Sequence, residues 1–172
     1  GGGSAVGGWD HLKVLMAAKE YGIQKVRKIK YVSFDGGGDA VTQLLAGNFQ
    51  IFTGDVSEIK GFVDAGDIKI IAVLSPNRLP GDFSKFYTAK EQGVNVVGAN
   101  WRGFYVPKGM SDDAYNFWAG AIKKMYDTPQ WKKTMAKNGL APLDLSGKAF
   151  EAFVANSVAS IQTISKQIGI IK

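Results

Sequence analysis

The sequence predicts an α/β fold for about its first hundred residues and a helix-rich section for the remainder. Two observations predict the first part: short extended apolar segments alternate with helix-like segments, and glycine-rich turns separate several of them. A third observation predicts the second part, because capping residues and helical apolar spacing dominate after Pro107. Alternating strands and helices typically build a mostly parallel sheet covered by helices. The change of character near Asn100 marks a candidate boundary between two lobes.

Three helices are expected in the first part, and each is followed by a glycine that suits a helix end. They span 8–21, 39–46 and 56–65 and end at Gly22, Gly47 and Gly66. Asp55 and Glu58 have the spacing of a capping box, which predicts the start of the third helix. A further short helix is expected over 88–92, after a loop that contains Pro80 and Gly81.

Five strands are expected between and after these helices. They span 28–33, 49–53, 68–74, 94–97 and 102–107. The 28–33 segment alternates, with Ile29, Tyr31 and Ser33 on one face. The 68–74 segment is nearly continuous in apolar residues, which predicts a strand buried on both faces.

Three longer helices are expected after residue 110. Ser111 is placed to cap a helix over 112–126, and Thr128 followed by Pro129 is typical of a helix start. That second helix ends at Asn138 and Gly139. Ser146 precedes a last helix over 148–168, whose apolar residues keep helical spacing.

The positive charge of the chain invites an anionic partner, although a solvated basic surface explains most of the lysines, and the composition argues against several classes of protein. The formal net charge is +6, from 21 basic and 15 acidic residues, and there is no cysteine. The basic residues are spread along the chain and are not interleaved with aromatic residues in one block, so we expect no nucleic-acid partner. No apolar run approaches the roughly 20 residues of a membrane span, so direct membrane insertion is not expected. No signal peptide is recognisable in the chain.

The inventory of reactive side chains is poor. His11 is the single histidine, and we expect it to be a packed or capping residue. Without cysteine or further histidines, no catalytic residue, metal site or cofactor is expected. Two alternatives stay open: an α/β enzyme acting on an anionic substrate, and a ligand-sensing module without catalysis.

Two glycine-rich loops are candidates for anion binding. Residues 1–8 precede the first expected helix, and residues 36–38 precede the second. A glycine-rich turn that leads into a helix exposes unpaired N–H groups at the positive end of the helix dipole. Neither loop fits the phosphate-binding or dinucleotide-binding motif. The glycines also fit a plain reading as tight turns, and residues 1–4 fit the remnant of a linker.

Several runs, in order along nearly the whole chain, resemble one family. They are 3–12 (GSAVGGWDHL), 34–41 (FDGGGDAV), 44–47 (LLAG), 77–80 (NRLP), 100–104 (NWRGF) and 128–131 (TPQW). The chain is therefore identified as a member of the substrate-binding proteins of tripartite tricarboxylate transporters. The resemblance implies a type II periplasmic-binding clamshell in an α/β fold, truncated at its N-terminus so that most of the first lobe is missing. Residues 1–99 would be the second lobe and residues 100–172 the C-terminal return to the first, with a hinge near 99–101.

The resemblance also implies the function. The protein would capture a small organic carboxylate, such as citrate, another tricarboxylate or a dicarboxylate, and deliver it to the membrane permease subunits of the transporter. It would be periplasmic, without catalysis, metal or cofactor. The ligand-binding residues that it implies are Gly3, Ser4, Ala5, Val6, Gly7, Asp35, Gly36, Gly37, Gly38 and Asp55.

Overall fold

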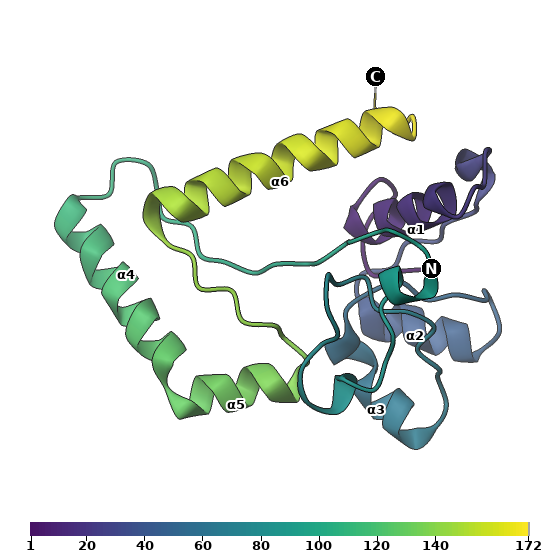
Figure 1. The fold of residues 1–172 in the computed structure, drawn as a ribbon, viewed down its shortest axis with the longest axis horizontal. Coiled ribbons are helices and arrows are strands. Elements are labelled where there is room, and N and C mark those ends of the chain that lie inside the picture. Colours follow the sequence, from purple (N-terminus) through teal and green to yellow (C-terminus); the bar gives the residue numbers. More distant parts are fainter. Residues whose placement is uncertain (172) are drawn as a thin grey trace.

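Helices dominate the regular structure of the chain. A computed structural model describes residues 1–171 (Figure 1). The α-helices among them are α1 (Trp9–Glu20), α2 (Gly37–Leu45), α3 (Val56–Ala65), α4 (Asp112–Asp127), α5 (Pro129–Lys137) and α6 (Gly147–Gln167). The short 3-10 helices are η1 (Val26–Lys28), η2 (Gly81–Phe83) and η3 (Lys90–Gln92). All six long helices expected from the sequence are therefore confirmed, and the short helix expected over 88–92 is reduced to η3.

Local capping explains why the helices begin where they do. The Ser111 hydroxyl accepts a hydrogen bond from the Ala114 N–H at 3.3 Å at the start of α4. Thr128 does the same for the Trp131 N–H at 3.2 Å at the start of α5. Asp55 and Glu58 form the expected capping box of α3. One start differs: α2 begins at Gly37, two residues before the expected position, so two glycines lie inside its first turn.

The strand predictions for 28–33, 49–53, 68–74, 94–97 and 102–107 are wrong as regular strands. Within residues 1–171 the pairing is confined to isolated parallel bridges, which join Gly2 to Ser33, Gly2 to Thr53 and Val73 to Thr88. The reason is that a ladder needs several consecutive residues to find partners, whereas these segments meet at single points. Residues 26–28 form the 3-10 helix η1, and the alternating pattern did not predict this helix.

The 68–74 segment differs most from its expectation, because it is not buried on both faces. Val73 is buried, but Ile71 is 68% exposed. Val73 exchanges backbone hydrogen bonds with the 87–89 segment, and Leu74 accepts one from the Gly98 N–H at 2.8 Å. The segment therefore has neighbours on only part of its length.

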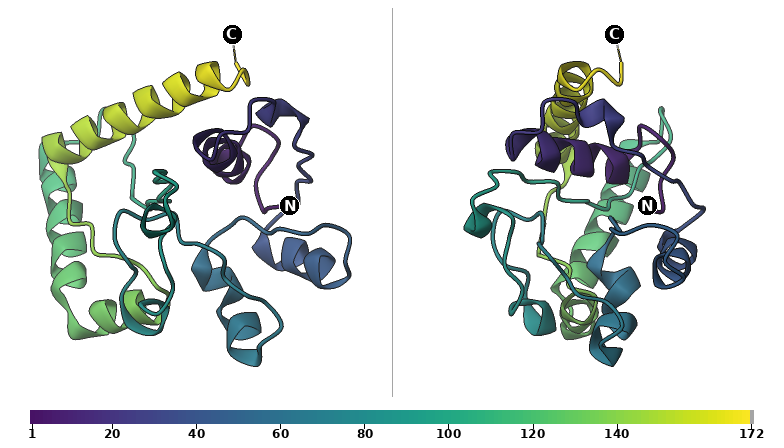
Figure 2. Two further views of the ribbon diagram at one scale, coloured as in Figure 1. Left: turned by 45° about the vertical axis from the view of Figure 1, so that its right-hand side comes forward. Right: turned by 90° about the vertical axis from the view of Figure 1, so that its right-hand side faces the viewer.

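The buried core lies where α1 meets η1 and the end of α6. Leu12, Leu15, Val26 and Ile168 form the cluster, and further apolar side chains from α1 and α6 pack against it. Helix α2 contacts α3, and α5 contacts η2 and α4. Figure 1 and the left view of Figure 2 show α4, α5 and α6 as an open frame beside the α1–α3 part. Among the described residues, none of the helices has the length and apolar character of a membrane span.

Candidate functional site

Three helix starts meet at one place because three extended segments run side by side in the same direction. The Gly2 N–H donates to the Val32 carbonyl at 3.2 Å, and the Gly2 carbonyl accepts from the Phe34 N–H at 3.0 Å. On the other side, the Gly1 carbonyl accepts from the Thr53 N–H at 3.0 Å. Both bridges are parallel, so the turns into α1, α2 and α3 lie at the same edge. This is the edge at which ligands bind in open α/β folds.

The glycines allow these turns to touch. A Cβ atom on Gly3 would lie 2.7 Å from the carbonyl carbon of Gly36 and from the nitrogen of Gly37. A Cβ on Gly37 would collide with the carboxylate of Glu58 on α3. Gly36 has a φ of 150°, which a residue with a side chain rarely adopts. The two glycine-rich loops predicted from the sequence are therefore brought together, with α3 beside them.

Two aromatic side chains hold the loop that runs over residues 4–7. The Tyr31 hydroxyl donates to the Ser4 carbonyl at 2.9 Å, and the Gly7 N–H donates to His11 Nδ1 at 3.0 Å. The rings of His11 and Tyr31 stack with centroids 4.5 Å apart. The Ser4 hydroxyl oxygen accepts the Asp10 N–H at 3.2 Å, so it caps the first turn of α1. The expectation that His11 is a packed or capping residue is confirmed.

Burial sets the protonation of these two rings. Desolvation lowers the pKa of His11 below its usual value, so the ring is neutral near pH 7 and its Nδ1 is free to accept. Desolvation also raises the pKa of Tyr31, against an opposing effect from its hydrogen bond with Ser4. Tyr31 therefore keeps its proton and remains a donor throughout the neutral range.

Asp55 is drawn towards the segment that leads to the helix-rich part. The Asn100 amide donates to its two carboxylate oxygens at 3.2 and 3.1 Å, and Arg102 forms an ion pair with it. Its negative charge is thereby compensated. Of the other residues expected at the site, Ala5, Val6, Asp35 and Gly38 are exposed, whereas Gly37 is buried.

Tyr31, Asn100 and Arg102 were missed by sequence reasoning. The alternation of Ile29, Tyr31 and Ser33 carried a signal for Tyr31, since it placed the phenol on a defined face of the expected strand. The sequence carried no signal for the contacts of Asn100 and Arg102, because these residues lie 45 and 47 positions from their partner Asp55.

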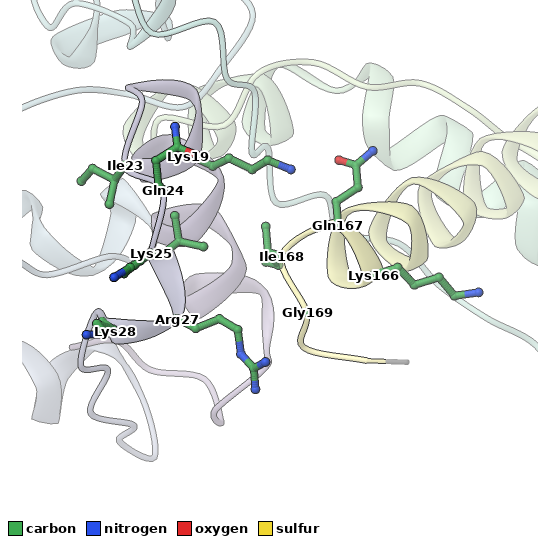
Figure 3. Close-up of a pocket in the computed structure, with 11 residues that line it drawn as sticks. Lys19, Ile23, Gln24, Lys25, Arg27, Lys28, Lys166, Gln167, Ile168 and Gly169 are labelled. Carbon is green, nitrogen blue, oxygen red and sulfur yellow. The ribbon is translucent and has the colours of Figure 1, made fainter.

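A small hollow of about 270 Å³ lies behind the 4–7 loop. It is lined by Val6, His11, Leu15, Arg27, Ile29, Tyr31 and Ile170. A larger hollow of about 600 Å³ lies between η1 and the end of α6. Figure 3 shows Lys25 and Lys28 on one side of it and Lys166 on the other, directed apart. These three amino groups therefore do not converge on one point of the hollow.

Backbone groups dominate the site. Among residues 1–171, no group of three or more histidine, cysteine, aspartate or glutamate side chains could hold a metal ion. The one histidine is occupied by the loop. What the site offers is backbone N–H groups at the start of α2, and those at the start of α1 other than the Asp10 N–H, on turns that a ligand can approach closely.

The chain is similar to a set of known receptors. Residues 3–170 match the family described as tripartite tricarboxylate transporter family receptor. A Cupriavidus necator protein, described as a UPF0065 protein in the gbd 5′ region, is 23% identical over 162 residues, or 94% of this chain and 48% of that protein. The chain therefore spans about half the length of this curated relative.

Two solved structures show the fold. A TctC solute-binding protein from Polaromonas, solved without ligand, superposes with a TM-score of 0.72 at 24% identity, over 96% of this chain and 56% of that one. A protein of R. palustris solved with adipate superposes with a TM-score of 0.86 at 21% identity, over 98% and 55%. The expected fold class is confirmed: the chain has the fold of part of a solute-binding clamshell.

Proposed function

Because the chain belongs to the tripartite tricarboxylate transporter receptor family, we propose that it captures a small organic carboxylate outside the cytoplasm and delivers it to a membrane permease. The observation that carries this proposal is the meeting of the 3–7 loop, the 36–38 loop and the start of α3 at one edge of three parallel segments. The ligand-binding residues would be those of the two loops, together with Asp35.

The electrostatics of this edge suit a carboxylate. The first N–H groups of α1 and α2 have no carbonyl partner within their own helices, and the helix dipoles add partial positive charge. Charge supplied by backbone groups holds an anion without a buried salt bridge, which favours release to a transporter. The net charge of +6 adds attraction at longer range. A dicarboxylate or tricarboxylate is the proposed ligand class, supported by the adipate in the R. palustris neighbour.

We place this chemistry in a two-lobed protein. Residues 1–99 would form one lobe, and residues 100–172 would cross to the other. In support, no backbone hydrogen bond within residues 1–171 involves residues 99–106, so this segment is free to pair with further chain. The contacts of Asn100 and Arg102 with Asp55 lie at the crossing and would bear on lobe closure. The protein would be a periplasmic receptor without catalytic activity.

Calorimetric titration tests the proposal. Adipate, citrate and other di- and tricarboxylates are titrated into the 172-residue chain and into the two-lobed protein that carries it. We expect one ligand per two-lobed protein, and weaker or no binding by the 172-residue chain alone, because it presents only one side of the cleft. If the two-lobed protein bound none of the acids in the panel, the carboxylate proposal would be wrong.

A matched pair of variants tests the position of the site. Gly38 lies in the first turn of α2, and a Cβ there meets no atom within 4 Å. Gly38→Asp adds a negative charge that the helix start tolerates but that repels an anion in the site. We expect at least a tenfold loss of carboxylate affinity in Gly38→Asp and little change in the neutral control Gly38→Asn. Equal affinities of the two variants would place the ligand elsewhere.

A further inference from the structure

Side chains hold both ends of the 4–7 loop, and a backbone turn closes its middle. Tyr31 holds its first residue through the Ser4 carbonyl, and His11 holds its last through the Gly7 N–H. Between them, Val6 is 67% exposed. Gly7 has a φ of 84°, a conformation that glycine adopts without strain, and the Gly8 N–H donates to the Ala5 carbonyl at 2.8 Å across the turn. The turn shapes the loop locally, and the two aromatic contacts fix its ends relative to α1 and to the 28–33 segment.

The two aromatic residues act as one unit because they pack on each other. Their rings lie 21° from parallel with centroids 4.5 Å apart, and both line the 270 Å³ hollow behind the loop. His11 is 7% exposed, so its ring has little freedom to turn. We propose that His11 and Tyr31 are positioning residues, which hold the 4–7 loop in the conformation that binds the carboxylate. This inference rests on the proposed function, since it assigns a role within the same site.

The hydrogen bond from Gly7 to His11 depends on the protonation state of the His11 ring. The Gly7 N–H is a donor, so His11 Nδ1 must be unprotonated to accept from it. A proton on Nδ1 would set two donors against each other and release the end of the loop. Carboxylate binding should therefore weaken as the pH falls through the His11 pKa, which burial holds below the ordinary value of about 6.5.

The neighbouring charged groups support this direction. Arg27 of η1 lines the same hollow, and no carboxylate lines it beside His11 among the described residues. Asp10, next to His11 on α1, is paired with Lys13 at 2.8 Å. Tyr31 stays neutral over the tested range because burial raises its pKa. Ile170, near the C-terminal end of the described chain, also lines the hollow and is apolar.

Four variants separate positioning from plain stability. His11→Asn keeps an acceptor near the place of Nδ1 but cannot titrate, and His11→Leu removes the acceptor. Tyr31→Phe keeps the ring stack and removes the donation to Ser4, while Tyr21→Phe alters a phenol that is 77% exposed and serves as the control. Affinity for the carboxylate is measured from pH 7.5 to 5 in the protein used for the titrations above. The Gly7 amide and the His11 ring are followed by NMR in the same range.

We expect about a tenfold loss of affinity at pH 7.5 in His11→Leu and Tyr31→Phe, and little change in Tyr21→Phe. In the wild-type protein, the Gly7 amide signal should shift with the His11 titration and affinity should fall with it. His11→Asn should bind near the wild-type level at pH 7.5 and should show only the fall in affinity that protonation of the ligand itself causes. Comparison at the same pH removes any effect from protonation of the ligand itself.

Two results would overturn the inference in different ways. If the wild type and His11→Leu bind the carboxylate equally at every pH, the positioning role is wrong and the proposed function stands. The second result is a two-lobed protein that binds no carboxylate although its Gly7 amide titrates with His11. In that case the contact between His11 and the loop is real, but both the proposed function and the role of His11 in binding are wrong. Should His11→Leu fail to fold, the pH profiles of the wild type and His11→Asn still decide the question.

Discussion

Residues 1–99 and residues 100–171 differ in how much they bury, although both contain well-capped helices. The first region holds most of the buried apolar side chains of the described chain, from Leu12 to Val96, whereas the second contributes Met135 and Ile168. Helix α4 has 16 residues and buries none of them. The rings of its Phe117 and Trp118 meet edge to face with centroids 5.5 Å apart, and both remain exposed.

The difference teaches that helix formation and core formation have separate requirements. A helix with a good cap and an apolar stripe forms its backbone hydrogen bonds locally, but most of its stability in a protein comes from packing that stripe. The first region packs α1 on η1 and α2 on α3. In the second, Trp101 and Tyr105 of the crossing segment contact the rings of Phe150 and Phe153 on α6. The stability of the chain should therefore reside in residues 1–99 and the residues that touch them.

The largest expected effect comes from one pair of phenylalanines. Phe83 is 2% exposed, and Phe117 is 67% exposed. Phe83→Ala should lower the free energy of unfolding by about 3–5 kcal/mol, because it leaves a cavity beside η2. Phe117→Ala should change it by less than about 0.5 kcal/mol. Urea unfolding followed by circular dichroism measures both, and equal losses would remove the distinction between the two regions.

The sequence predicted those parts of the fold that depend on residues close together along the chain. The caps at Ser111, at Thr128 and at Asp55 with Glu58 each act over three residues, and all of those helix starts are confirmed. The strands failed because pairing depends on distant residues: Val73 meets Thr88 at one bridge only. An alternating or apolar run shows that a segment suits a sheet, but not that a partner lies beside it.

The candidate site shows the same difference between contacts that are local in sequence and contacts between distant residues. The glycine loops were predicted because each loop and the helix that follows it are local in sequence. Tyr31 lies 27 residues from Ser4, so its contact with the loop could not be read from spacing. Asp55 was predicted at the site for its loop position, but the direction of its carboxylate depends on Asn100 and Arg102.

The next effect in size concerns the contact between the two loops. Gly3→Ala would drive a Cβ atom into the backbone of residues 36 and 37, which a side-chain rotation cannot relieve. We expect a loss of about 2–3 kcal/mol in the free energy of unfolding. Gly38→Ala is the control, because a Cβ there meets open space. If both variants unfold at the same urea concentration, the loops do not touch as the structure shows.

A smaller effect is expected where the two regions are joined. Asp55→Ala removes the capping box of α3 and the partner of Asn100 and Arg102, at a cost of about 1 kcal/mol. The exposed ion pair with Arg102 accounts for only a minor part of it. Asp55→Asn keeps a good cap without the charge, so thermal unfolding should place it between the wild type and Asp55→Ala. A loss in Asp55→Asn as large as in Asp55→Ala would make the charge, and not the cap, the main contribution.

The smallest expected effect compares two glycines inside helices, Gly61 in α3 and Gly120 in α4. Both are exposed, and a Cβ on either meets no atom within 4 Å. Alanine has the higher helix propensity, by about 0.8–1.0 kcal/mol. Gly61→Ala should raise the free energy of global unfolding by most of that amount, because α3 packs on α2.

Gly120→Ala should act on α4 alone. Since α4 buries no residue, its local opening is expected to be independent of the core. Hydrogen exchange should slow within residues 112–127, while the midpoint of global urea unfolding stays unchanged. If the midpoint rose as much as in Gly61→Ala, α4 would unfold together with the core. Its exposed aromatic face would then contribute to the cooperative unit through contacts beyond those described for α5.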